Sequence, residues 1–113
     1  MNESDRTPIP SELLKSLQTI FPRFGDAELL AEIETGDAGL HGVMRHFTEY
    51  FGAFGQTFTK GQLQALGRVL DQATVQGGKL ENAASTCFLE HLHQIKSGRI
   101  LLSFVSQRTK EQI

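Results

Sequence analysis

Five carboxylates lie close together in this chain, between residues 26 and 37, and no Lys or Arg lies among them. They belong to Asp26, Glu28, Glu32, Glu34 and Asp37. On a helix, Glu28 and Glu32 are one turn apart, and this like-charge contact costs about 0.2–0.5 kcal/mol. Glu34 and Asp37 lie near the negative end of the helix dipole, which adds a small further penalty. A partner with a basic surface would turn these repulsions into attractions. The segment therefore predicts a surface that binds a cationic partner.

Charge is also distributed unevenly along the whole chain, with the excess of acids in its first part. Up to residue 40 the sequence has eight acids and three bases, a net charge of −5, and the rest has five acids and eight bases, a net charge of +3. Such an asymmetry concerns partners and association rates rather than the fold. Two simpler explanations stay open: the acids of residues 26–37 maintain solubility, or they pair with Lys and Arg of later segments in the same molecule.

The basic residues do not predict nucleic-acid binding. The net charge of the chain is −2, and affinity for phosphates needs a concentration of Lys and Arg. One such concentration is present, and we expect it to be a solvated face spread over two elements: Lys96, Arg99, Arg108 and Lys110. Nucleic acid is therefore not an expected partner.

Residues that could catalyse a reaction do not converge in the sequence. His41 and His46 are five residues apart and His91 and His93 are two apart, so neither pair shares a helical face well. No Cys–His cluster is apparent, and a zinc site needs three or four convergent ligands. Glu90, beside the two later histidines, has no nucleophile or glycine-rich loop near it. We expect no enzyme activity, no metal and no cofactor.

The single cysteine, Cys87, cannot form a disulfide within the chain, which favours a reducing compartment. No apolar run is long enough for export or for crossing a membrane. We therefore expect a cytoplasmic protein that does not use a membrane as a partner.

Apolar residues recur at spacings of three and four along most of the chain, which is the pattern of amphipathic helices. Residues 1–8 lack it and are expected to be disordered, whereas residues 9–113 are expected to form one helical domain. The last segment, from Arg99 to about Lys110, fits a helix or a short strand, and helix is favoured because no second strand could pair with it. The earlier helices are predicted from Pro10 to Phe21, from an N-cap at Asp26 to Gly36, from about Val43 to Phe54, from an N-cap at Thr59 to Gly77, and from Lys79 to Ser97 with Gly98 after it. The predicted fold class is all-α, a compact single-domain bundle of five or six helices.

An aromatic stripe of helical period follows the acidic segment and consists of Phe47, Tyr50, Phe51, Phe54 and Phe58. Phenylalanines at this spacing are expected to fill the core of a small bundle. Tyr50 is the only tyrosine, and its hydroxyl needs water or a partner. We expect it at the edge of the core, where it could anchor a protein partner.

Two short motifs carry a family resemblance. The segment Cys-Phe-Leu-Glu-His-Leu, from Cys87 to Leu92, resembles the Phe-Leu-Glu signature of small, uncharacterised bacterial all-helical proteins. Phe88, Leu89 and Leu92 match as core positions, and Glu90 matches as a polar one. The Ile-Phe-Pro-Arg-Phe sequence at residues 20–24 is similar to the end of their first helix. Proteins of this type are candidate immunity proteins, which neutralise toxins delivered between competing bacteria, so the resemblance implies a toxin as the partner.

Charge pattern and resemblance together give two functional expectations. The leading one is an immunity-type protein that binds and blocks a bacterial toxin with a basic cleft, for example a nuclease. The alternative is a self-associating structural or interaction module, in which the acidic early helices of one copy meet the basic late helices of another and form a homodimer. The expected partner-binding residues are Asp26, Glu28, Glu32, Glu34, Asp37 and Tyr50.

Overall fold

A computed structural model describes residues 9–95 and 98–111 of the chain, and every regular element in these ranges is helical. The predicted disordered segment, residues 1–8, and the predicted helix end at residues 96–97 lie outside the described residues. The described helices are α1 (Pro10–Ile20), α2 (Ala27–Thr35), α3 (Leu40–Phe54), α4 (Lys60–Gln76), α5 (Gly78–Cys87), α6 (Gly98–Leu101) and α7 (Gln107–Lys110). Short 3₁₀ turns cover Gly55–Thr57, Leu89–Gln94 and Leu102–Phe104. The all-α prediction is confirmed.

Local signals in the sequence explain where α2 and α4 begin and end. The carboxylate of Asp26 accepts a hydrogen bond of 2.9 Å from the Leu29 amide, and α2 ends at Gly36, whose φ of 85° is in the left-handed region. At the start of α4, the Thr59 hydroxyl accepts from the Gln62 amide and the Gln62 side chain accepts from the Thr59 amide. The predicted boundaries at Asp26, Gly36, Thr59 and Gly77 are confirmed.

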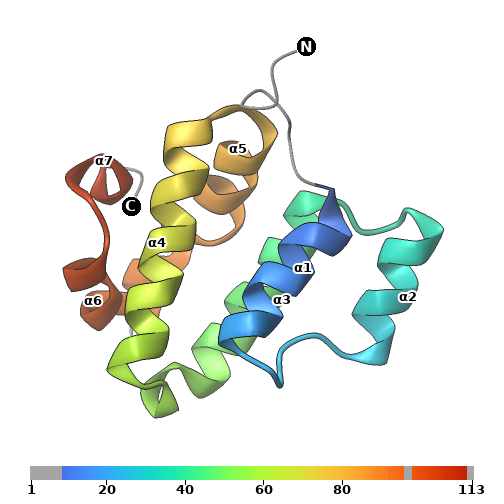
Figure 1. The fold of residues 1–113 in the computed structure, drawn as a ribbon, viewed down its shortest axis with the longest axis horizontal. Coiled ribbons are helices and arrows are strands. Elements are labelled where there is room, and N and C mark those ends of the chain that lie inside the picture. The colour runs from blue at the N-terminus through green and yellow to red at the C-terminus, as the bar shows by residue number, and fades with distance from the viewer. Residues whose placement is uncertain (1–8, 96–97, 112–113) are drawn as a thin grey trace.

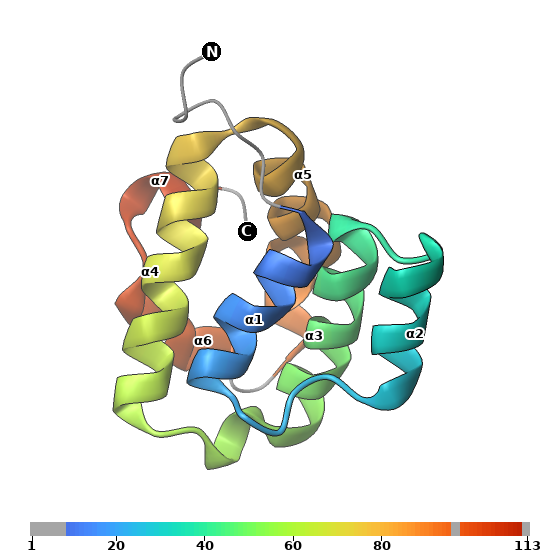
Figure 2. The same cartoon turned by 45° about the vertical axis from the view of Figure 1, so that its right-hand side comes forward.

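The helices surround one core, which four of them enclose. α5 packs against both α3 and α4, and α1 also lies across α3 and α4. The short helices α6 and α7 pack beside α4, whereas α2 stands at the outside of the bundle, next to α3 (Figures 1 and 2). Only Leu29 of α2 is buried, and the helix makes few contacts with other elements. This leaves α2 as the most loosely attached of the longer helices.

Aromatic rings fill the centre of the bundle. Phe47 of α3 is fully buried, and its ring centroid lies 5.4 Å from those of both Phe21 and Phe88. Phe51 contacts Phe88 edge-on, also at 5.4 Å. These ring pairs join the end of α1, the middle of α3 and the end of α5 in one cluster. The prediction that Phe54 belongs to this core is wrong, because half of its surface is exposed.

The predicted helix over residues 79–97 is interrupted. α5 ends at Cys87, and Phe88 has φ −129° and ψ −63°, after which the chain continues as a 3₁₀ turn. The predicted apolar stripe is nevertheless on the inside, since four of its members are buried and one is partly buried: Leu80, Ala84, Phe88, Leu92 and Ile95. Periodicity thus identifies the buried residues but does not reveal the break.

A close backbone contact follows the interruption. Gly98 begins α6 instead of ending α5, and a Cβ atom placed on it would lie 2.2 Å from the Leu92 carbonyl oxygen. The break turns the chain so that the last segment returns along α4. That segment is helical, as favoured, but it forms two short helices and a 3₁₀ turn. None of the helices in the described ranges has the length and apolar character needed to cross a membrane.

Candidate functional site

The acidic residues gather on and around α2, the outermost helix. Glu28, Glu34 and Asp37 are exposed, as is Asp26 at the N-cap. Within the described residues, the only ion-pair partner found for any of the five acids is a histidine, and none of them lies within 4.0 Å of a Lys or Arg nitrogen. Pairing with the basic residues that the structure describes therefore does not account for this charge.

Two of the acids accept hydrogen bonds at the ends of α2. Asp26 caps the helix through the Leu29 amide, and the Asp37 carboxylate accepts a hydrogen bond of 2.9 Å from the Thr35 hydroxyl. Both contacts use one oxygen, so each carboxylate keeps lone pairs for a partner. Glu28 and Glu34 make no hydrogen bond or ion pair within the described residues. These two side chains are the freest charges of α2.

Glu32 lies differently from the expectation that it faces solvent beside Glu28. One of its carboxylate oxygens is buried and lies 3.3 Å from Nε2 of His46 on α3. The reason is helical geometry: Glu32 is three residues after the buried Leu29, and residues three apart share a face. Glu32 therefore joins α2 to α3, and its charge is directed inward.

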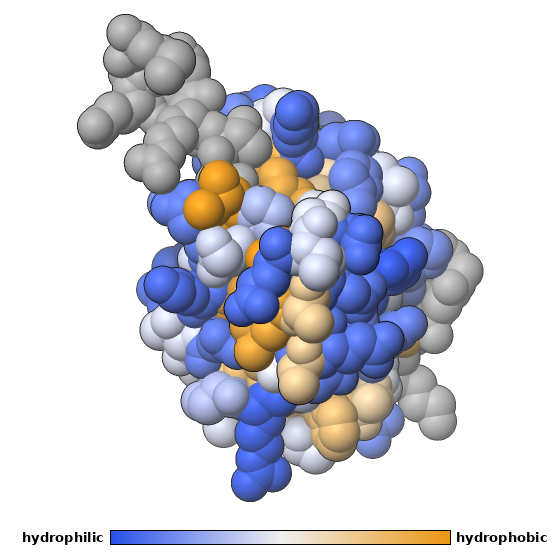
Figure 3. All heavy atoms as spheres, turned by 90° about the vertical axis from the view of Figure 1, so that its right-hand side faces the viewer, coloured by the Kyte–Doolittle hydropathy of each residue, from blue (hydrophilic) through white to orange (hydrophobic). Residues whose placement is uncertain are grey.

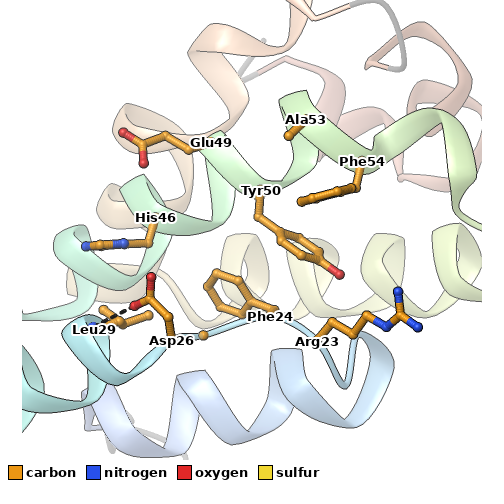
Figure 4. Close-up of a pocket in the computed structure, with 10 residues that line it drawn as sticks. Arg23, Phe24, Asp26, Leu29, His46, Glu49, Tyr50, Ala53 and Phe54 are labelled. Carbon is orange, nitrogen blue, oxygen red and sulfur yellow. Dashed lines mark hydrogen bonds between the residues drawn. The ribbon is translucent and has the colours of Figure 1, made fainter.

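A groove of about 290 Å³ runs between the start of α2 and the outer side of α3. Its floor is apolar, made by Phe24 and Leu29, and its polar groups are Asp26, His46 and Glu49 together with Arg23 and the Tyr50 hydroxyl. Figure 4 shows the Tyr50 hydroxyl pointing toward the same end of the groove as the Arg23 guanidinium, with Phe54 beside the tyrosine ring. We call this the α2–α3 groove.

Tyr50 lies at the edge of the core, as the sequence predicts. It is half-buried, and its ring centroid lies 5.4 Å from that of Phe24 and 5.0 Å from that of Phe54. Phe54 and Leu30 are apolar but 50% and 45% exposed. The face that carries α2 shows hydrophobic residues within a largely hydrophilic surface (Figure 3). Exposed apolar groups with a charged surround are typical of protein-binding surfaces.

The basic residues of the last segment do not form a comparable site. Arg99, Arg108 and Lys110 are exposed, on α6 and α7, and Lys96 lies outside the described residues. No group of three or more His, Cys, Asp or Glu in the described ranges is arranged to hold a metal ion. We assign neither a nucleic-acid site nor a metal site.

The structure brings together a histidine and the cysteine, which the sequence analysis did not connect. Nδ1 of His41 lies 3.1 Å from Sγ of Cys87, joining α3 to the end of α5. Burial raises the pKa of the Cys87 thiol, Glu90 raises it further, and Arg45 opposes them. The two residues are far apart in the sequence and belong to no common motif, so only the packing of α3 on α5 reveals them.

Comparison of the chain with protein-family models, with curated proteins and with solved structures gave no match.

Proposed function

We propose that this chain is an immunity-type protein that binds a bacterial toxin through α2 and the α2–α3 groove and thereby blocks the toxin. The observation that carries the proposal is the set of α2 carboxylates that no Lys or Arg of the described residues neutralises. A helix that contributes one buried residue to the core and several free charges to the surface adds little to stability. Its charges are better explained by a partner than by the fold.

Electrostatic complementarity would supply fast and selective association. Nucleases hold polyanions in basic clefts, so a nuclease toxin is a fitting target, with Glu28 and Glu34 in the place of substrate phosphates. Opposite potentials on two proteins raise the association rate, and added salt reduces this gain. The blockade is steric and electrostatic, so it needs no catalysis and no cofactor in this chain.

Apolar contacts would supply the rest of the binding energy. Leu30 and Phe54 are exposed, and Tyr50 presents a ring edge and a hydroxyl at the α2–α3 groove. Tyrosine and other aromatic side chains at the centre of an interface often dominate its affinity. In this proposal the protein works in the cytoplasm, where its single thiol would stay reduced.

The test needs a purified toxin domain, and the first choice is the C-terminal domain of a large secreted protein encoded next to this gene. Association and dissociation rates are measured at about 50 and 300 mM salt for the wild type and for the double variant Glu28→Lys, Glu34→Lys. We expect the double variant to lose about tenfold or more in affinity at low salt, mainly through slower association.

The matched control changes the same amount of charge elsewhere. Glu90→Lys combined with Glu111→Lys alters two exposed acids that lie outside α2, and we expect about twofold change or less. Equal losses in both double variants would mean that net charge, and not the α2 surface, determines binding. An affinity that responds neither to salt nor to the α2 reversals would overturn the charge mechanism.

Self-association is the alternative, and it makes a different prediction. Arg99, Arg108 and Lys110 are exposed and could meet the α2 acids of a second copy. Sedimentation velocity of the protein alone, at low and high salt, then gives a dimer that dissociates as salt is added. A monomer at both salt concentrations would leave the toxin-binding proposal as the better one.

A further inference from the structure

A chain of polar side chains links the facing sides of α3 and α5. His41 Nδ1 lies 3.1 Å from Cys87 Sγ, and His41 Nε2 lies 3.3 Å from the side-chain amide nitrogen of Asn82. The Thr86 hydroxyl donates to the other atom of that amide, Asn82 Oδ1, at 3.3 Å. A thiol beside an imidazole that a third group orients is the arrangement by which proteins activate a sulfur nucleophile.

The scaffold holds the sulfur in place. Cys87 is the last residue of α5, and its carbonyl oxygen accepts a hydrogen bond from the Thr48 hydroxyl of α3. Phe88, the next residue, is fully buried against Phe47 and Phe51. The backbone that carries the thiol is therefore held against α3, while His41 and Asn82 are exposed to solvent.

Cys87 also borders open space. Cys87 lines a hollow of about 520 Å³ on the α3–α5 side of the molecule, which is wide and open. Its wall includes the Thr48 hydroxyl, the aliphatic Ile95 and the charged or titratable groups of Arg45, Glu49 and His91. This hollow is separate from the α2–α3 groove, although Glu49 borders both.

The orientation of the Asn82 amide decides which ring nitrogen of His41 carries the proton. The structure places the amide nitrogen of Asn82 toward His41 Nε2; a half-turn of the amide keeps both contacts and places Oδ1 there instead, with the Thr86 hydroxyl then accepting from the amide nitrogen. With Oδ1 toward the ring, Asn82 accepts the Nε2 proton of His41, which leaves Nδ1 as an acceptor opposite the thiol. His41 is then placed as a base for Cys87.

The surroundings of Cys87 raise the pKa of its thiol, so a base is needed to form the thiolate. Burial is the main reason that the pKa of Cys87 is raised, and Glu90 adds to it, whereas Arg45 opposes it. The thiol alone is therefore protonated at neutral pH and would react slowly. Among the side chains that the structure describes, the titratable groups that face it from α3 and from the following turn are His41, Arg45, Glu49, Glu90 and His91.

We infer that Cys87 is a nucleophilic thiol that exchanges with small disulfides, with His41 as its base and Asn82 as a positioning residue. His41 Nδ1 takes the proton from Sγ, and the thiolate attacks one sulfur of a disulfide RSSR. The Cys87–S bond forms while the S–S bond breaks, and the leaving thiolate RS⁻ takes the proton from His41. The protein thiol is oxidised to a mixed disulfide and half of the reagent is reduced to a thiol.

The test follows the reaction of the protein with 4,4′-dithiodipyridine, a neutral disulfide whose released thiopyridone absorbs light. We expect the wild-type rate to change little between about pH 7 and pH 8.5, because His41 removes the thiol proton as the sulfur attacks. His41→Gln is expected to react about tenfold more slowly at neutral pH and to gain about tenfold per pH unit, as an unaided thiol does. Cys87→Ser should release nothing, since it removes the single cysteine.

Two further variants separate positioning from general effects. Asn82→Ala should give an intermediate rate and move the pH profile toward that of His41→Gln. His91→Gln changes a histidine that lines the same hollow, whereas His41 is the histidine in contact with the sulfur, and we expect the rate of this variant to stay within about twofold of the wild type. Matching rates and pH profiles for the wild type and folded His41→Gln would overturn the inference, and so would a larger loss in His91→Gln than in His41→Gln.

Discussion

The carboxylate of Asp71, on α4, connects α7 to the rest of the bundle through hydrogen bonds. Its Oδ1 accepts hydrogen bonds of 2.9 Å from the Ser106 amide and 2.7 Å from the Thr109 hydroxyl. The fully buried Thr109 hydroxyl also lies 3.1 Å from that of Thr74, which donates to the Leu70 carbonyl. A polar network at this depth stabilises only while each member has its partner.

The titration of Asp71 gives a prediction about stability and pH. Burial raises the pKa of this carboxyl, but hydrogen bonds from the Ser106 amide, the Thr109 hydroxyl and the Ser106 hydroxyl outweigh burial, so the pKa is lowered. The carboxylate therefore stabilises the fold above its unfolded pKa of about 3.9, and the contribution is lost as pH falls through the folded value. We expect Asp71→Asn to cost about 1 kcal/mol at pH 7 and almost nothing near pH 2, measured by denaturant unfolding. An equal cost at both pH values would show that the charge of Asp71 does not stabilise the fold.

At the scale of helices, local chemistry explains what the sequence predicts well. Asp26 and Thr59 are side chains that bind free amides at helix starts, and Gly36 has the left-handed backbone that ends a helix. Each of these signals acts within a few residues, so it can be recognised without the rest of the fold. The same reason explains the acidic surface, whose residues are neighbours in the sequence.

Features created by tertiary packing could not be predicted in this way. The break at Phe88 depends on how the last segment returns to α4, and the His41–Cys87 contact joins residues 46 positions apart. Glu32 was predicted to face solvent, but it follows Leu29 by three residues and is drawn against α3. For Glu32, the three-residue spacing from the buried Leu29 was enough to predict a side chain on the inner face of α2.

Gly67 marks a close approach between α4 and the 3₁₀ turn Leu102–Phe104, and this contact gives a prediction. It is buried in the middle of α4, and a Cβ atom there would lie 2.1 Å from the Phe104 carbonyl oxygen. We expect Gly67→Ala to destabilise the protein by about 1–3 kcal/mol, because backbone must move to admit the methyl group.

The control for Gly67 is Gly52, an exposed glycine of α3 with nothing within 4 Å of the added Cβ position. Alanine there should stabilise the helix by up to about 1 kcal/mol, since it removes the entropic cost of glycine. Both variants are compared by thermal and denaturant unfolding. Similar changes for the two substitutions would contradict the close contact between α4 and the last segment.

For the whole molecule, stability is expected to be uneven. α3, α4 and α5 share the buried aromatic and aliphatic core, whereas α2 contributes one buried side chain and carries like charges along its length. Regions with few buried contacts open locally at lower free energy than the core. The surface proposed for partner binding therefore lies on the part of the molecule that opens most readily.

Removing the cap of α2 tests this difference. Asp26→Ala deletes the hydrogen bond to the Leu29 amide, which costs a helix about 1 kcal/mol. If α2 opens independently of the core, its amides will exchange with solvent about fivefold faster in the variant, while the slowest amides of α3 and α4 keep their wild-type rates under native conditions. Hydrogen exchange followed by mass spectrometry resolves the segments. Faster exchange by the same factor in α2 and in the core would instead mean that α2 unfolds only with the whole protein, and its acids would then be held as rigidly as the core that supports them.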